Sequence, residues 1–340
     1  MKKLLSVLLA ALLVMGMMSF AAAEKAPEDY KGELTIYSPH DSDPLNAGVA
    51  GFEAKYPNVK VNVVADGTGN LLNRIKAESA APEADILWGG GADSLAAYKD
   101  YFQPYKPSCI DLLDSSLYDK DYLWIGESPL PMVFLVNTNL VAEADIPKSW
   151  KDLADPKWEG KIAIADPASS GSAYTQLNTM LMIFGKVDDD YAAGWDFVKG
   201  LMKNLVIQSG SSGAHKNVDS GEYPIGITLE KAAVQYDLSD KGHLKMIYPE
   251  DGTSAVPDGI AIVKGCRNQE LAELFVEYAL SAETQAAQNK DFGRRPIRSD
   301  VTPVGLAPLG DITLMNYNFD YAGANKSDIV EKWQDAVVGD

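Results

Sequence analysis

Three short loops rich in glycine and serine are the parts of this sequence best suited to hold an anion. They occupy residues 89–91 (GGG), 169–172 (SSGS) and 209–213 (SGSSG), each between a predicted strand and a predicted helix. A helix start presents unpaired backbone N–H groups and partial positive charge, which can hold a phosphate or a carboxylate. Glycine lets a ligand approach the backbone, and serine adds a hydroxyl. One such loop is usually only a helix cap, whereas three at the carboxyl ends of strands favour an anion site.

Histidines and acids near the strand ends are the next candidates. His40 follows the first predicted strand, where a ligand contact and a solvated turn residue are equally good interpretations. His215 follows the third loop in the first turn of a predicted helix, where it can donate to an anion. Asp41 and Glu230 can accept sugar hydroxyls, although Glu230 fits equally well as an acid favoured by a helix dipole.

Two adjacent arginines, Arg294 and Arg295, stand out in so acidic a chain. We expect one of them, with Arg295 as the candidate, to reach a ligand while the other pairs on the surface, although a structural role fits either. The loop at 66–69 (DGTG) is a weaker candidate that a simple turn explains equally well. The candidate ligand-binding residues are therefore Ser38, His40, Asp41, Gly91, Asp93, Ser169, Ser170, Ser172, Ser211, Ser212, His215, Glu230 and Arg295.

Motifs for metal binding or catalysis are missing from the sequence. No two histidines share a zinc-ligand spacing, and there is no GxSxG, SxxK or HExxH motif and no phosphate-loop lysine. We therefore expect no catalytic residue, no metal ion and no cofactor. Serines at a helix start beside His215 can imitate a catalytic dyad, so an exported hydrolase is the alternative from another functional class. Cys109 and Cys266 lack CxxC spacing, and a disulfide and two free thiols are equally open.

The charge balance narrows the class of partner. The 340 residues contain 30 basic and 48 acidic side chains, which gives a formal charge of -18. Such a surface repels phosphate backbones and anionic lipid, so we expect no nucleic acid partner and no docking on a membrane surface. Hydrophobic residues make up 46% of the chain, as in ordinary globular proteins, and the length suits one large or two medium domains.

The N-terminal residues predict export. Lys2 and Lys3 precede an apolar run over residues 4–18, and residues 21–23 (AAA) offer the small side chains that signal peptidase requires. This pattern is typical of a secretory signal peptide over residues 1–23, with an uncleaved anchor as the alternative. No cysteine lies near the cleavage site, which argues against a lipid anchor. We expect a soluble periplasmic protein.

Strand and helix patterns alternate along the rest of the chain. Helical spacing predicts helices near 45–55 and 70–80, helices that begin at Asp93 and near Ser172, and a mostly helical part from Asn268 interrupted once at 293–296. This order implies parallel sheets with helices on both faces, and the length favours two such lobes over one sheet. The predicted strands span residues 33–38, 59–65, 84–88, 131–137, 161–165, 205–208, 225–229, 245–248 and 259–263.

Two adjacent segments resemble a known protein family. Residues 149–163 (SWKDLADPKWEGKIA) are similar to the SW-DL-DP-W-GKI signature of the extracellular solute-binding proteins of ABC importers, and residues 166–172 (DPASSGS) continue it. Residues 36–40 (IYSPH) and 248–253 (YPEDGT) also fit the branch that contains ferric-iron-, thiamine-, aminoethylphosphonate- and hexose-phosphate-binding proteins. The resemblance spans nearly all of the chain after the predicted signal peptide.

The resemblance implies an α/β fold of the type II periplasmic-binding-protein class. This is a bilobed clamp of two mainly parallel sheets flanked by helices, with a ligand cleft between the lobes, and it closes by hinge bending. It also implies crossings between the lobes near 127–131 and 249–253. We accordingly expect residues 24–130 and 250–280 in lobe 1, and residues 131–249 and 281–340 in lobe 2.

Ferric iron is the main alternative ligand within this branch. Its ferric members use two adjacent tyrosines with a histidine and a carboxylate, whereas this sequence has no adjacent tyrosine pair and only Tyr236 stands where the pair would fall. An ammonium ligand would call for an aromatic cage, for which Trp88, Trp124 and Tyr174 are candidates, although buried aromatic residues usually belong to the core.

The interpretation that combines these observations is a monomeric periplasmic binding protein that captures a small hydroxylated anion. A sugar phosphate or a related organophosphate or phosphonate is the best description of that solute, and the implied partner is an ABC permease in the inner membrane. The loops around Ser170 and Ser212 would hold the phosphate. His215 and His40 would add positive character, while Asp41 and Glu230 would select hydroxyls.

Overall fold

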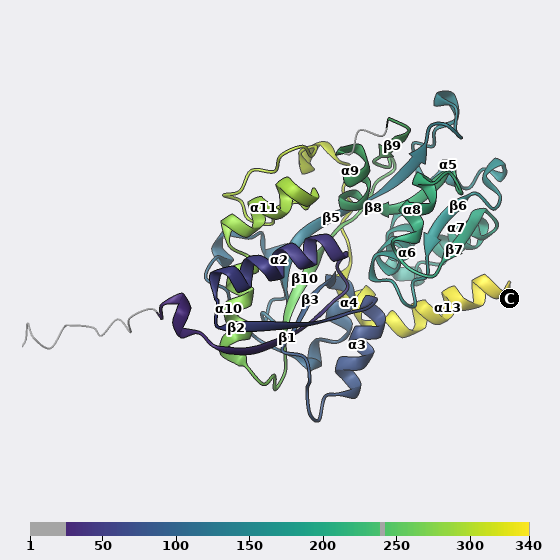
Figure 1. Cartoon of the computed structure of the whole chain (residues 1–340). Coiled ribbons are helices and arrows are strands. Elements are labelled where there is room, and N and C mark those ends of the chain that lie inside the picture. Colours follow the sequence, from purple (N-terminus) through teal and green to yellow (C-terminus); the bar gives the residue numbers. More distant parts are fainter. Residues whose placement is uncertain (1–24, 239–241, 340) are drawn as a thin grey trace, which may run out of the picture.

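A path of hydrogen-bonded strands runs through two lobes in the order β2-β1-β3-β10-β5-β8-β6-β7. The computed structural model describes residues 25–238 and 242–339, so the predicted signal peptide over 1–23 lies outside the described residues. Figure 1 shows the two lobes side by side, each with helices packed around its strands. Short 3₁₀ helices in the connections are Pro27–Asp29, Lys99–Tyr101, Ile110–Leu112, Ser115–Leu117, Glu143–Asp145, Pro156–Trp158, Val187–Asp189, Met202–Asn204 and Leu309–Asp311.

The first lobe is built on three parallel strands. β1 (Gly32–Ser38) pairs with β2 (Val59–Ala65) on one side and with β3 (Ile86–Gly91) on the other. Every residue of β3 is buried, as expected for a strand that has helices on both faces. The ring of Trp88 in β3 packs edge-on against Phe275, with ring centroids 5.1 Å apart. The helices of this lobe are α2 (Ser42–Lys55), α3 (Thr68–Ala77), α4 (Ala92–Ala97), α10 (Gln269–Ala279) and α11 (Ala282–Phe292).

The second lobe repeats this plan. β6 (Ile162–Ala165) pairs in parallel with β7 (Leu205–Gln208) and β8 (Ile225–Leu229). The SWKDL segment begins a short helix, since Ser149 caps it and Trp150 enters the core and donates from Nε1 to the carbonyl of Gly252 at 2.9 Å. The helices of this lobe are α5 (Trp150–Leu153), α6 (Gly171–Phe184), α7 (Ala192–Leu201), α8 (Gly213–Asp219), α9 (Glu230–Leu238) and α13 (Lys326–Val338).

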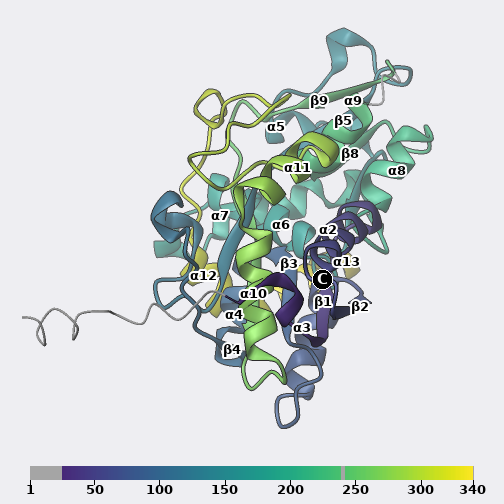
Figure 2. The ribbon, with the colours of Figure 1, turned by 60° about the vertical axis from the view of Figure 1, so that its left-hand side comes forward.

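One long strand and one return connection join the sheets of the two lobes, which Figure 2 shows from a second side. β5 (Ile125–Asn137) pairs with β10 (Ala255–Val263) as far as Pro131 and with β8 from Met132 onward, so the chain crosses between those two residues. β9 (Leu244–Ile247) pairs with the second half of β5, which places the return crossing between β9 and β10. The predicted positions near 127–131 and 249–253 lie beside these two crossings.

The bilobed clamp is confirmed, but its sheets are mixed rather than mainly parallel. The outer strands of each lobe pair in parallel, whereas β5 is antiparallel to β8, β9 and β10, and β10 is antiparallel to β3 and β4 (Phe102–Gln103). A strand that crosses from one lobe to the other enters the second sheet against the direction of its neighbours. An alternating strand–helix pattern does not reveal this direction.

The C-terminal part divides between the lobes differently from the prediction. α11, expected in lobe 2, packs on α2, where Gln288 Nε2 donates to the carbonyl of Pro44 at 3.1 Å, and Ile297 joins the first core. α12 (Phe319–Ala324) lies on α4, while Trp333 of α13 is buried in the second core. Residues 293–318 are irregular apart from one 3₁₀ turn, contrary to the predicted helices. Helical spacing predicts a helix but not the lobe that receives it.

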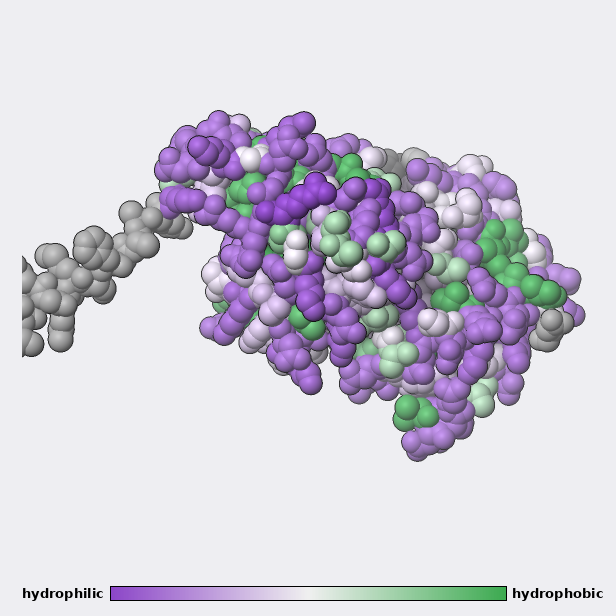
Figure 3. Space-filling view, turned by 90° about the horizontal axis from the view of Figure 1, so that it is seen from below, coloured by the Kyte–Doolittle hydropathy of each residue, from purple (hydrophilic) through white to green (hydrophobic). Residues whose placement is uncertain are grey.

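Polar side chains dominate the surface. Figure 3 shows a face that is largely hydrophilic, with separate hydrophobic patches. Among the described residues, no helix combines the length and the apolar character that a membrane crossing requires. The large apolar side chains that are exposed are scattered along the chain: Val63, Leu140, Val187, Val304, Leu314, Val337 and Val338.

Candidate functional site

A cavity of about 450 Å³ lies between the lobes at the carboxyl ends of the parallel strands. This is the position at which open α/β sheets bind ligands. Asp93, Glu230 and Arg295 are not among the residues that line it. The other ten candidates from the sequence do line it: Ser38, His40, Asp41, Gly91, Ser169, Ser170, Ser172, Ser211, Ser212 and His215.

Three serine hydroxyls from two loops meet on one side of the cavity; we call Ser170, Ser172 and Ser211 the serine cluster. The Oγ atoms of Ser170 and Ser211 are 2.6 Å apart, and Ser172 Oγ lies 3.1 Å from each of them. Ser170 also caps α6, since its Oγ accepts from the backbone N–H of Ala173 at 3.2 Å. The start of a 14-residue helix therefore faces the cavity beside three hydroxyls that can turn toward an anion.

The start of α3 approaches the serine cluster from the opposite lobe. A Cβ atom at Gly67 would lie 2.6 Å from the carbonyl oxygen of Ser169, and one at Gly171 would lie 2.7 Å from Thr68 Oγ1. Glycine at both positions therefore permits the two lobes to touch at this edge. The loop at 66–69 was a weaker candidate for the anion site, since its sequence fits a simple turn equally well. In the structure it lines the cavity through Asp66, Gly67 and Thr68.

Both histidines of the cavity are neutral at physiological pH. Burial, together with the neighbouring Arg294 guanidinium, lowers the pKa of His40, which is 7% exposed. Burial also lowers the pKa of His215 to about 4, although the nearby Asp41 carboxylate acts in the opposite direction. The expectation that they add positive character is wrong for this reason. Each ring still offers one N–H donor and one acceptor, and His215 Nδ1 lies 3.4 Å from Thr228 Oγ1.

Five side chains that meet beside the cavity form a buried charge network: His40, Glu127, Lys231, Asp258 and Arg294. Asp258 Oδ2 accepts from Arg294 at 3.1 Å and from Lys231 at 3.3 Å. Glu127 Oε2 accepts from Arg294 at 3.3 Å and lies 3.2 Å from His40 Nε2. Burial alone would raise the pKa of Asp258, but Lys231 and Arg294 lower it overall. Only His40, Lys231 and Asp258 of this network line the cavity.

The structure gives Arg295 and Glu230 a different role from the predicted one. Arg295 donates to both carboxylate oxygens of Glu230, from Nε at 2.6 Å and from a terminal nitrogen at 2.8 Å, and the Tyr248 hydroxyl donates to the same carboxylate. Arg294 is 2% exposed, so it does not pair on the surface either. Each arginine pairs with buried carboxylates: Arg294 with Glu127 and Asp258, and Arg295 with Glu230. These carboxylates lie on neighbouring elements of the fold, and the sequence does not show that proximity.

Asp93 lies behind the cavity rather than in it. Its Oδ2 accepts from Thr175 Oγ1 at 2.9 Å and from the Tyr317 hydroxyl at 2.6 Å, and its Oδ1 accepts from the backbone N–H of Ser94. Burial raises its pKa. Because Thr175 lines the cavity, Asp93 can hold that hydroxyl in place but does not face a ligand itself.

Some lining residues escaped the sequence reasoning. Lys231 directly follows the strand end at which Glu230 was chosen, so the same rule could have found it. Asp258 lies inside β10, where no local signal marks it. The other missed polar residues are Asn70, Thr175 and Thr228, whereas Asp66, Thr68 and Ser209 lie in loops that the sequence had already indicated. Within 25–238 and 242–339, no group of three His, Cys, Asp or Glu side chains is arranged to hold a metal ion.

Comparisons with known proteins find relatives of this chain by sequence. The profile described as bacterial extracellular solute-binding protein matches residues 81–325. An uncharacterized protein of Haemophilus influenzae is 31% identical over 326 residues, which cover 90% of this chain and 91% of that protein. A Sinorhizobium fredii protein named "Probable ABC transporter periplasmic-binding protein" is 28% identical over 269 residues, which cover 78% of this chain and 74% of that protein.

Solved structures extend the likeness to the whole fold. The periplasmic binding protein AfuA of Actinobacillus pleuropneumoniae, with exogenous fructose-6-phosphate bound, has a TM-score of 0.83 and 29% identity, covering 92% of this chain and 100% of that one. More distant relatives carry other names, among them Iron uptake protein A1 of Synechocystis and a Salmonella paratyphi A protein whose name refers to 2-aminoethylphosphonate binding.

Proposed function

The chain belongs to the bacterial extracellular solute-binding proteins, the periplasmic components of ABC importers, and from that premise we propose that its solute is a sugar phosphate or a related organophosphate. Such proteins work with a permease in the inner membrane. In this proposal the protein is a monomer without catalytic activity that reaches the periplasm after removal of residues 1–23.

The serine cluster is the observation that carries this proposal. A phosphate needs several hydrogen-bond donors around a tetrahedral centre, and Ser170, Ser172 and Ser211 bring three hydroxyls within 3.1 Å of one another. The unpaired N–H groups at the start of α6 stand beside them and favour negative charge. Ser170 and Ser172 come from one loop and Ser211 comes from another, so their hydroxyls can surround one oxyanion.

The rest of the cavity suits the hydroxyls of a sugar. The Asp41 carboxylate lines the cavity and does not cap the helix that follows it, which leaves it available as an acceptor. Thr228 and the neutral ring of His215 add groups that can both donate and accept. AfuA, which resembles this chain at 29% identity, was solved with fructose-6-phosphate, and that likeness supports the same class of solute here.

Closure of the lobes around the solute completes the proposed cycle. A ligand that contacts both lobes shifts the equilibrium between open and closed forms toward the closed form, and the permease would recognise that form. The close approach of Gly67 to Ser169 is the kind of contact that such a closed form requires.

A thermal-shift panel tests this proposal. Protein that has been unfolded and refolded to remove bound ligand is heated with fructose 6-phosphate, glucose 6-phosphate, free fructose, free glucose, 2-aminoethylphosphonate, thiamine and ferric citrate. A ligand at a hundred times its Kd adds about 2.7 kcal/mol, which is a shift of roughly a few degrees for a chain of this size.

We expect stabilisation by the hexose phosphates and none by the free sugars. Stabilisation by 2-aminoethylphosphonate alone would keep the serine cluster but remove the sugar from the proposal. Stabilisation by ferric citrate alone would overturn it and direct attention to Tyr236, whose ring lies 5.7 Å from that of His215.

A further inference from the structure

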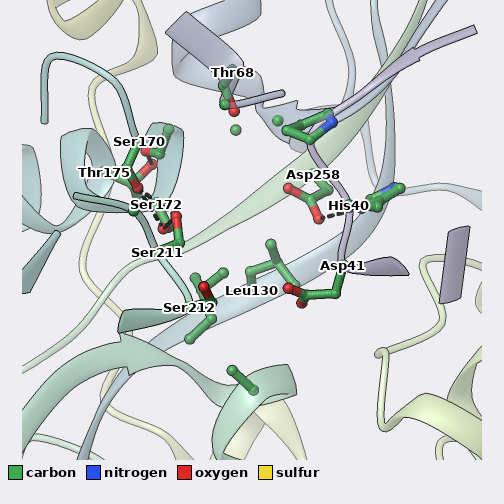
Figure 4. A pocket seen from close by; sticks show the side chains of 18 of the residues that line it. His40, Asp41, Thr68, Leu130, Ser170, Ser172, Thr175, Ser211, Ser212 and Asp258 are labelled. Atoms are coloured by element: carbon green, nitrogen blue, oxygen red, sulfur yellow. Dashed lines mark hydrogen bonds and ion pairs between the residues drawn. The ribbon is translucent and has the colours of Figure 1, made fainter. Parts of the chain in front are cut away.

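Asp258 faces the cavity, and only one of its two carboxylate oxygens accepts hydrogen bonds from described residues. Its Oδ2 accepts from Lys231 and Arg294 and lies 3.7 Å from His40 Nδ1. Its Oδ1 has no hydrogen-bond partner among the described residues, although the residue is only 6% exposed. Figure 4 shows one oxygen turned toward His40 and the other toward the side where the serine cluster lies.

The two sides of the cavity differ in what they offer a ligand. The serine side presents hydroxyls and the start of α6, which donate to an anion. The opposite side, on which Figure 4 places Asp258, His40 and Asp41, presents two carboxylates. Lys231 is matched by Asp258, to which its ammonium group donates, so Asp41 adds a carboxylate on this side that no cation of the network matches.

We propose that Asp258 Oδ1 accepts a hydroxyl of the bound sugar phosphate and that Asp258, together with Asp41, excludes a second phosphate from that end of the cavity. The inference rests on the proposed function and adds to it an orientation and a specificity: one phosphate lies against the serine cluster, and the sugar end lies against β10. The site thereby selects monophosphates over bisphosphates.

The charge balance of the buried network supports this role of Asp258. Two cations, Lys231 and Arg294, are matched by two carboxylates, Asp258 and Glu127, so no positive charge is left over to receive a second phosphate. Asp258 is ionised, since the two cations lower its pKa, and an ionised carboxylate only accepts. A ligand hydroxyl can donate to it, whereas a phosphate oxygen is repelled.

Binding of fructose 6-phosphate and fructose 1,6-bisphosphate tests the inference. Titration calorimetry at constant pH and ionic strength gives both affinities for wild type, Asp258→Asn and Glu127→Gln. We expect wild type to bind the monophosphate at least about 100-fold more tightly than the bisphosphate. Asp258→Asn should weaken monophosphate binding by about 10-fold and leave bisphosphate binding equal or stronger, because a charge-assisted hydrogen bond and a repulsion are lost together.

Glu127→Gln is the matched control. It removes another buried carboxylate of the same network, one that does not line the cavity. We expect it to lower the melting temperature without the loss of monophosphate affinity, since Glu127 does not line the cavity. Any gain in bisphosphate affinity should stay smaller than that of Asp258→Asn, because the charge that Glu127→Gln removes lies farther from the ligand. A purely structural role for Asp258 would make the two variants behave alike.

The outcomes separate this inference from the proposed function. Equal binding of both sugars by wild type overturns the inference and needs no variant. Equal weakening of both sugars by Asp258→Asn overturns it as well. If wild type binds fructose 6-phosphate not at all, the proposed function fails, and the orientation fails with it.

Discussion

Removal of the Ser211 hydroxyl measures what the serine cluster contributes to binding. Ser211 is the most suitable member, because it lies in an exposed loop before α8, whereas Ser170 caps α6 and Ser172 lies inside that helix. In Ser211→Ala, the hydroxyl that lies 2.6 Å from Ser170 Oγ and 3.1 Å from Ser172 Oγ is lost. The backbone and the helix caps keep their partners.

The expected size of the effect follows from the chemistry of the lost contact. A hydrogen bond to a charged group contributes about 1.5–3 kcal/mol, and its loss corresponds to a Kd raised about 10- to 150-fold. The two remaining hydroxyls keep binding measurable. Because Ser211 is exposed, the free energy of unfolding without ligand should change by less than about 0.5 kcal/mol.

Titration calorimetry with fructose 6-phosphate, beside thermal melts without ligand, measures both quantities. Ser220→Ala is the matched control, since Ser220 is an exposed serine near the end of α8 whose Oγ donates to the carbonyl of Asn217 at 3.1 Å, outside the cavity. If Ser211→Ala binds as tightly as Ser220→Ala and wild type, the serine cluster does not hold the phosphate. A large fall in melting temperature would instead assign Ser211 to stability.

Two further predictions concern pH and closure. Burial lowers the pKa of His215 from 6.5 to about 4, so the unfolded chain takes up a proton before the folded protein does, and stability should fall by about 3 kcal/mol as the pH drops from 6.5 to 4. His215→Gln should flatten that slope in urea denaturation, and an unchanged slope would assign it to other groups. Gly67→Ala should weaken fructose 6-phosphate binding about 5- to 150-fold by keeping the lobes apart, since its φ of -63° suits any residue but its Cβ would lie 2.6 Å from Ser169 O. Gly200→Ala, where nothing lies within 4 Å, should bind like wild type, and equal affinities for both variants would contradict the closure argument.

Strands with regular apolar patterns could be predicted from the sequence, and the proline-containing parts of β5 and β10 could not. The bounds of β2, β7 and β8 match the predicted ranges, because apolar residues make up most of each strand and all three contain β-branched residues. Residues 125–130 of β5 and 255–258 of β10 were missed, since Gly126 and Pro129 break the first pattern and Pro257 breaks the second. These prolines are tolerated because Pro129 stands opposite Pro257 in β10, where neither needs an N–H donor.

The site shows the same division between local and long-range information. The serine loops were found because strand ends and helix starts are local features. Glu230 and Lys231 are neighbours at the start of α9, yet one bonds to Arg295 and the other to Asp258. Successive residues on a helix point about 100° apart, so one step in sequence decides whether a side chain reaches the cavity. No pattern in the sequence reveals which of the two does.

An acidic protein can bind an anion because the binding depends on local dipoles rather than on net charge. The formal charge of -18 is a sum over the whole chain, and at physiological ionic strength the field of exposed charges is screened over about 8 Å. Inside the cavity, Lys231 is matched by Asp258 and both histidines are neutral, so the anion meets hydroxyls and N–H groups instead of free cations. Such donors are fixed in direction, so in the proposed complex they hold an oxyanion at one place while the carboxylates opposite reject a second. Net charge therefore argues against nucleic acid as a partner without arguing against a small phosphate ester.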